Sequence, residues 1–147
     1  MSKEIKISIC GDVCSECPRY IATETDDLLE LRKIAELWFR LGFRARILDP
    51  GDLKCSGCSK DKSCSYNINR CEHLGNNSNC GECDHFPCDK LNLVFQKTDS
   101  LNEGCKTKCS EREYKELYKA FLMKRQILTE IHEDFKRINK AKTACTQ

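Results

Sequence analysis

Cysteines at metal-ligand spacing are the residues of this chain whose types and positions could do chemistry. The chain has 147 residues, and 13 of them are cysteine. Three groups stand out: Cys10-x3-Cys14-x2-Cys17, the turn Cys55-Ser56-Gly57-Cys58, and Cys80-Gly81-Glu82-Cys83 followed by Cys88. In a reducing compartment, cysteine pairs spaced by two residues are typical ligands of a tetrahedral metal ion. An odd number of cysteines also fits poorly with a closed set of disulfides.

Ten cysteines are our candidate metal ligands. They are Cys10, Cys14, Cys17, Cys55, Cys58, Cys64, Cys71, Cys80, Cys83 and Cys88. They suffice for two sites of four thiolates with two cysteines left over, whereas counting Cys105 and Cys109 as well would give enough for three sites. The spacing leaves open which cysteines share a metal. Zinc is favoured, because two such turns are typical of tetrahedral thiolate sites. An iron–sulfur cluster is the alternative, because clusters also use cysteine thiolates.

Five further residues are weaker candidates. Cys105 and Cys109 are spaced by four at an expected helix entry, a position that lowers a thiol pKa, so they are either a ligand pair, a redox pair or merely exposed. His73 and His85 lie among the cysteines and either could be a ligand, but we interpret both as loop residues because enough thiolates lie nearby. His132 is interpreted as a surface or boundary residue.

No catalytic signature accompanies the cysteines. The chain has no GxSxG, P-loop or HExxH motif, and a cysteine nucleophile would need a base that nothing singles out. We therefore name no catalytic residue, and the sequence does not favour an enzyme.

The elements that must position the cysteines read as a mixture of strands and helices. Alternation over residues 4–9 predicts a short strand, and a weaker alternation over residues 43–47 predicts a second one. Thr25-Asp26-Asp27 reads as a helix start, before an apolar stripe that ends at the Gly42 cap. Residues 89–97 are expected to form a short helix, and 105–109 a loop. A capping box at Ser110 to Glu113 then opens a long amphipathic helix.

The resulting prediction is an α+β fold in a single domain over residues 1–147. It comprises residues 1–48 (strand, cysteine loop and helix), the cysteine-rich region 49–109 and the long helix 110–139. Residues 49–88 contain seven cysteines but few large apolar side chains, too few to offset the entropy of ordering the segment. We therefore expect bound metal to replace the missing core there.

Charge and composition limit the partners. The net charge is only +2, so no strong field favours nucleic acid or membrane. A local excess of Lys and Arg over residues 106–142 reads as a solvated helix face, so nucleic-acid binding is only a second alternative. We see no targeting segment and no membrane span, which predicts a cytoplasmic protein. The long helix leaves a monomer or a weak homodimer open, and a protein partner is expected but not identified.

The cysteine motifs together resemble a known family. The matching segments are Cys10-Gly11-x-x-Cys14-x-x-Cys17-Pro18-x-Tyr20-Ile21-Ala22-Thr23, Ala35-Glu36-x-Trp38, Cys55-x-Gly57-Cys58 and Cys80-Gly81-Glu82-Cys83-Asp84-His85-Phe86-Pro87-Cys88. They are similar to a cysteine-rich bacterial and archaeal family catalogued as domain of unknown function 3795. The resemblance covers roughly residues 10–91 and departs from the family pattern between Cys64 and Cys71. It implies metal binding and supplies no reaction.

Overall fold

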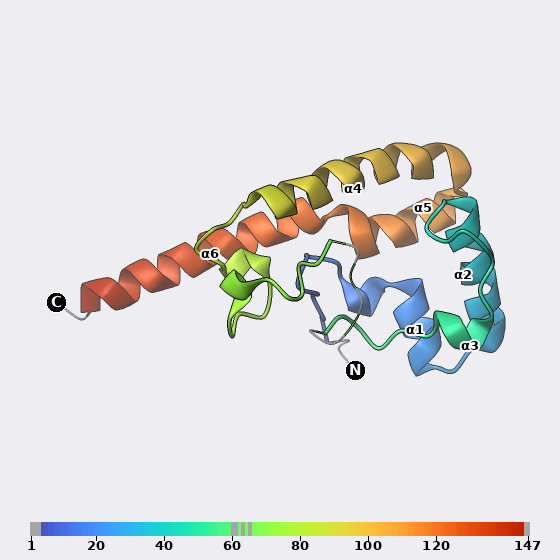
Figure 1. Ribbon diagram of the computed structural model, residues 1–147, viewed down its shortest axis with the longest axis horizontal. Coiled ribbons are helices and arrows are strands. Elements are labelled where there is room, and N and C mark those ends of the chain that lie inside the picture. The colour runs from blue at the N-terminus through green and yellow to red at the C-terminus, as the bar shows by residue number, and fades with distance from the viewer. Residues whose placement is uncertain (1–3, 60–61, 63, 65, 146–147) are drawn as a thin grey trace.

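The regular structure of this chain is helical, so the predicted α+β class is wrong. The computed structural model describes residues 4–59, 62, 64 and 66–145, with side chains up to residue 142. Within these ranges the elements are η1 (Cys14–Glu16), α1 (Pro18–Glu24), α2 (Leu28–Arg40), α3 (Pro50–Leu53), η2 (Glu72–Leu74), η3 (Cys80–Glu82), α4 (Asp89–Lys108), α5 (Glu111–Leu117), η4 (Tyr118–Leu122) and α6 (Lys124–Cys145). Figure 1 shows α4 and α6 side by side, with α1 to α3 at one end of the molecule.

Neither expected strand forms in the described chain. Residues 4–9 make only an isolated antiparallel bridge between Ile7 and Val13, because the chain turns back tightly at Gly11. The amide of Val13 then donates to Ala120 O in η4 (2.8 Å) instead of extending a ladder. Residues 43–47 are bends after the end of α2, and no described strand lies beside them to supply hydrogen bonds.

Helix α2 is capped at both ends, but it begins later than the expected start with Asp26 and Asp27 in its first turn. Asp27 is its N-cap and accepts a hydrogen bond from the amide of Glu30 (3.0 Å), whereas Thr25 is the C-cap of α1. At the other end, Phe43 N donates to Trp38 O (2.9 Å), which is the six-to-one hydrogen bond of a Schellman motif. The rings of Trp38 and Phe43 also pack edge to face, 5.4 Å apart. These contacts fix the direction in which the chain leaves α2.

Helix α4 is longer than the predicted helix 89–97 and joins the two apolar clusters of the protein. Its first half contributes Leu91, Val94 and Phe95 to a cluster that also includes Leu128. Its second half carries Cys105 into a cluster built mainly on α2. Residues 105–108, expected to be loop, are the last turn of this helix because the apolar positions continue at helical spacing.

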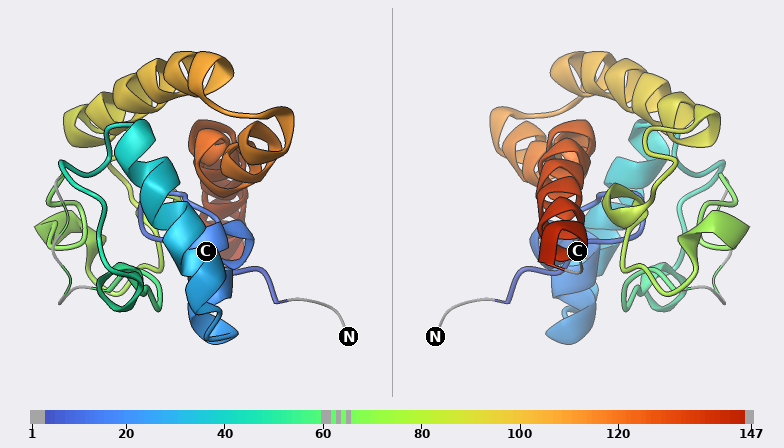
Figure 2. Two further views of the ribbon diagram at one scale, coloured as in Figure 1. Left: turned by 90° about the vertical axis from the view of Figure 1, so that its right-hand side faces the viewer. Right: turned by 90° about the vertical axis from the view of Figure 1, so that its left-hand side faces the viewer.

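The predicted continuous helix 110–139 is instead α5, η4 and α6. The capping box is confirmed: Ser110 Oγ accepts from Glu113 N (3.1 Å), and Glu113 Oε1 accepts from Ser110 N (2.9 Å). A π-helical turn, η4, interrupts the helix. Its Ala120 carbonyl oxygen accepts a hydrogen bond from the amide of Val13. Beyond it, α6 runs back along α4 and projects past the rest of the molecule, as Figures 1 and 2 show. No helix in the described ranges is long and apolar enough to cross a membrane.

Two glycines bring cysteine segments against α6. A Cβ on Gly11 would lie 2.9 Å from both Leu128 Cγ and Lys124 Cβ. A Cβ on Gly81 would lie 2.8 Å from Ile131 Cγ2 and 2.9 Å from the carbonyl oxygen of Leu128. Both glycines directly follow a cysteine, so the Cys-Gly step is a device for seating a cysteine loop on one helix.

We predict that Gly81→Ala lowers the free energy of unfolding by about 1–3 kcal/mol, because the added methyl group overpacks the contact with α6. Gly104→Ala is the matched control: no atom lies within 4 Å of a Cβ there, and the residue is inside α4. Alanine should stabilise that position by up to about 1 kcal/mol. Denaturant unfolding followed by circular dichroism measures both variants. Equal effects of the two substitutions would contradict close packing at Gly81.

Candidate functional site

The first cysteine set lies where the N-terminal loop meets the Cys55 turn. Four of the predicted ligands, Cys14, Cys17, Cys55 and Cys58, line a cavity of about 320 Å³. We call this set site A. Cys14 and Cys17 are buried, at 8% and 7% exposure, whereas Cys58 is exposed. Two segments nearly 40 residues apart in sequence thus contribute two thiols each to one cavity.

Hydrogen bonds position the sulfurs of site A. Interaction with the neighbouring Cys58 lowers the pKa of Cys14, although burial opposes this. Burial raises the pKa of Cys17 to about 11, while the amides of Tyr20 and Arg19 at the start of α1 donate to its sulfur and oppose this rise. Hydrogen bonds of this kind favour a thiolate.

Basic side chains surround the Cys55 turn. Lys62 Nζ lies 3.6 Å from Cys55 Sγ and donates to it. Lys6 Nζ donates to the carbonyl oxygen of Ser56 (3.3 Å). From α1, Thr23 Oγ1 accepts from the amide of Cys55 (2.9 Å). Two ammonium groups beside a thiol cluster offset part of the negative charge that ionised sulfurs would carry.

The second cysteine set surrounds a much smaller cavity of about 40 Å³ below the start of α4. Its cysteine lining consists of Cys71, Cys80, Cys83 and Cys88. We call this set site B. His73 and His85 line the same cavity, with their ring centroids 4.1 Å apart. The sequence analysis interpreted both histidines as loop residues and left open that either is a ligand, and the structure places both at the cavity that the four cysteines line.

Backbone contacts hold site B against the N-terminal loop. Cys80 N donates to Ile9 O (2.9 Å), which ties η3 to the chain just before Cys10. Cys83 Sγ accepts from the amide of His85 (3.4 Å) and lies 3.8 Å from His73 O. Burial raises the pKa of Cys80 to about 12, and the neighbouring thiols Cys10 and Cys88 add to that rise.

The two remaining predicted ligands fall outside the two lining sets. Cys10 is half-buried between them, hydrogen-bonded to Ser8 (3.5 Å), and burial raises its pKa to about 11. Cys64 is half-buried in the loop before Ile68. In the described ranges, no three Cys, His, Asp or Glu side chains already converge closely enough to hold a metal ion. The cysteines of each set therefore line one cavity, but their sulfur atoms do not converge on a common metal position.

Two other sequence readings are corrected. Cys105 is fully buried inside α4, and burial raises its pKa to about 12, so the expected lowering at a helix entry is wrong. The pKa of Cys109 is likewise raised by burial. His132 is also buried, at 7% exposure, and its Nδ1 lies 2.9 Å from Gly81 O. This histidine therefore positions η3 and is not a surface residue.

A buried ion pair beside the cysteine loop was not anticipated from the sequence. Lys124 Nζ, at the start of α6, lies 2.9 Å from Asp12 Oδ1, and the lysine side chain is only 9% exposed. Burial disfavours the ammonium ion, but Asp12 and Cys10 more than offset this, so the pKa of Lys124 is raised. The signal that could have identified it is a lysine four residues before Leu128 on the apolar stripe of the helix.

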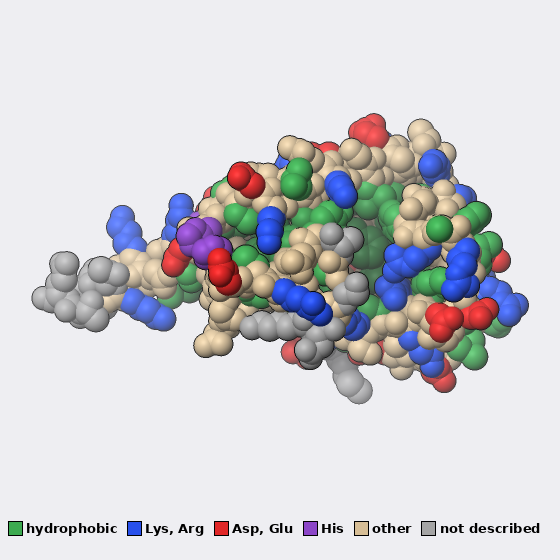
Figure 3. All heavy atoms as spheres, in the orientation of Figure 1, with side chains coloured by type: hydrophobic (Ala, Val, Ile, Leu, Met, Phe, Trp, Pro, Cys, Tyr) green, Lys and Arg blue, Asp and Glu red, His purple; other side chains and the backbone are tan. Residues whose placement is uncertain are grey.

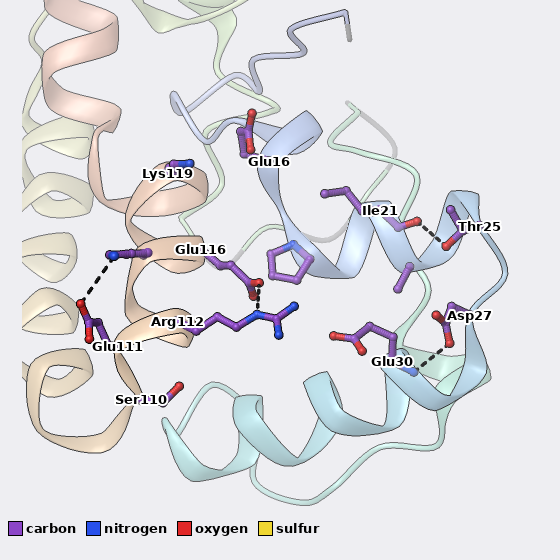
Figure 4. Close-up of a pocket in the computed structure, with 13 residues that line it drawn as sticks. Glu16, Ile21, Thr25, Asp27, Glu30, Ser110, Glu111, Arg112, Glu116 and Lys119 are labelled. Carbon is purple, nitrogen blue, oxygen red and sulfur yellow. Dashed lines mark hydrogen bonds and ion pairs between the residues drawn. The ribbon is translucent and has the colours of Figure 1, made fainter. Parts of the chain in front are cut away.

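A separate groove of about 830 Å³ separates α1 and the start of α2 from α5, and Figure 4 shows it. Its charged walls are largely paired within themselves: Arg112 with Glu116 (3.4 Å), and Lys115 with Glu111 (3.5 Å). No cysteine or histidine lines it.

The comparisons with known proteins agree with the motifs. A family model described as a protein of unknown function (DUF3795) matches residues 6–93. The chain belongs to this family. No curated protein and no solved structure matches the chain. The family region contains both cysteine sets, whereas Leu128, Ile131 and His132, which hold the loops on α6, lie beyond it.

We predict that Lys124→Met destabilises the protein by about 2–4 kcal/mol, because it leaves the Asp12 carboxylate without its partner in a mostly buried position. Asp12→Asn combined with Lys124→Met should recover part of that loss, since no unpaired charge remains. Denaturant unfolding of the two variants and the wild type measures the difference. A double variant no more stable than Lys124→Met would contradict the role of the ion pair.

Proposed function

We propose that this protein is a metal-binding interaction module of the cytoplasm, in which two zinc ions held by site A and site B fix the cysteine loops on the helices. One observation carries the proposal. Eight of the ten candidate cysteines fall into two sets of four, each around its own cavity. Four thiolates are the usual ligand set of a structural zinc site.

The lining of site A supports zinc. Its four thiols line one cavity, and Cys14 and Cys58 interact closely enough to shift each other's pKa. Four thiolates from two short cysteine turns are a usual ligand set of zinc. The amide donors at Cys17 and the ammonium group at Cys55 would then stabilise the bound thiolates.

The weak core of the loop region supplies the reason for metal. Between residues 54 and 88, the buried apolar side chains in the described chain are Ile68 and Leu74. Burial of two such side chains contributes roughly 3–6 kcal/mol. Ordering more than 30 residues costs far more than that. Binding of two zinc ions to these two thiol sets would supply the difference.

The proposed interaction role rests on the groove between α1 and α5. Arg112 and Glu30 point toward each other across it from opposite walls, and Ile21 of α1 also lines it (Figure 4). Charges of both signs around apolar side chains are typical of the rim of a protein interface. The metal sites would hold α1 in place, because Cys17 is the residue immediately before that helix.

An iron–sulfur cluster at site A is the second candidate, and the cavity volume favours it. About 320 Å³ exceeds the roughly 30 Å³ that a single water molecule occupies in the liquid, so site A has room for more than one ion. Four cysteine thiolates also suit a cluster, and hydrogen bonds to the sulfurs would tune its potential. Such a protein would be coloured, whereas the zinc form would be colourless.

Elemental analysis of protein purified without oxygen tests the proposal. We predict two zinc ions per chain and no visible absorbance. Cys14→Ser with Cys58→Ser should remove one ion, and Cys80→Ser with Cys83→Ser should remove the other. Cys109→Ser is the matched control and should keep both, because Cys109 lies outside both cavities.

The outcomes separate the candidates. One zinc ion together with iron and matching sulfide would assign the cluster to the site whose cysteine pair abolishes the colour. A chain without bound metal that keeps the wild-type circular dichroism spectrum and stability would contradict both candidates.

A further inference from the structure

Site B contains more metal donors than one zinc ion uses. Four thiols and the two imidazoles of His73 and His85 line a single cavity of about 40 Å³. That volume is close to the roughly 30 Å³ of one water molecule, so it suits one ion. A tetrahedral zinc site takes four ligands. Two further donors therefore line the same cavity beyond the four that one ion takes.

Site A differs in this respect. The chain has three histidines, and the lining of site A includes none of them. His73 and His85 line site B, and His132 lies against it through its contact with Gly81 and a ring contact with Phe86 at 4.7 Å. The imidazoles are thus concentrated at one of two otherwise similar sites.

Exposure also separates the two sites. Site A includes two buried cysteines, whereas the cysteines of site B are half-buried or exposed. The His73 side chain is 50% exposed. Figure 3 shows histidine side chains as an exposed group on the surface, near the point where α6 leaves the body of the molecule. An ion in site B would have imidazoles between it and solvent.

We propose that site B is an exchangeable metal site, at which His73 and His85 pass zinc between the four thiolates and an outside acceptor, while site A holds its ion permanently. The inference rests on the proposed function. In the exchange step, the lone pair of a neutral imidazole nitrogen of His73 or His85 would form a bond to zinc as one zinc–sulfur bond breaks, and the departing thiolate would keep its electron pair.

The acceptor or donor is identified by its chemistry. It must present nitrogen or thiolate ligands for zinc and reach the exposed imidazoles. A small chelator that binds through a pyridine nitrogen, an azo nitrogen and a phenolate oxygen, 4-(2-pyridylazo)resorcinol, serves as the probe acceptor.

The test is stopped-flow release of zinc from the full chain, loaded with two zinc ions, to an excess of this chelator. We expect two phases of one ion each, and the faster phase should be absent in Cys80→Ser with Cys83→Ser. His73→Gln with His85→Gln should keep two zinc ions and the wild-type circular dichroism spectrum. It should slow the fast phase about tenfold, equivalent to a barrier about 1.4 kcal/mol higher, and leave the slow phase unchanged.

Glu72→Gln is the control for a change in the same segment that keeps both imidazoles, and its fast phase should stay within about twofold of wild type. An unchanged fast phase in the double histidine variant would overturn the inference. Faster release in that variant would also overturn it, because the histidines would then retain the ion instead of helping its transfer. A wild-type chain that binds no zinc contradicts the proposed function and this inference with it. Two bound ions with unaltered release rates overturn the inference alone.

Discussion

The close approach of two cysteine loops to α6 is the contact on which the rest of the molecule depends. Gly11 and Gly81 each lie where a side chain would collide with this helix, and the collisions share Leu128 as a neighbour. The carbonyl of Ala120 and the ring of His132 add hydrogen-bonding contacts to the same two loops. Because these contacts lie on η4 and the first half of α6, they hold both loops against one stretch of the chain. The helix that provides most of them lies beyond the family match, so in this protein a C-terminal segment packs against the cysteine loops of the family region.

The helices and the cysteine loops of this protein differ in how much apolar surface they bury. The helices α2, α4 and α5 bury apolar stripes against one another, and α4 continues into the second cluster with Leu128. The loops between α3 and α4 bury almost nothing apolar, and their thiols instead gather at two cavities. In the proposed account, metal bonds replace hydrophobic burial in this half. The difference in exposure between the sites then gives one ion a permanent role and the other an exchangeable one.

The sequence predicted the helices better than the strands. Local signals are strong at Asp27 and Ser110, where a side chain caps a helix within three residues, and both caps are present. The strand at residues 4–9 was wrong because alternation reports a half-buried extended chain and says nothing about whether a partner strand exists. Spacing identified the cysteines but could not divide them into sets, because the partners of Cys14 and Cys17 are nearly 40 residues away. The roles of His132 and Lys124 depend on burial by distant loops, which no local pattern reveals.

Hydrogen–deuterium exchange with and without a zinc chelator tests the central claim most directly, because it reports the order of the loop region segment by segment. The account predicts that metal removal abolishes amide protection in residues 10–17 and 49–88, while the apolar stripes of α2 and α4 keep most of theirs. Protection in residues 49–88 that is unchanged after complete metal removal would contradict it, since the loops would then be ordered without metal.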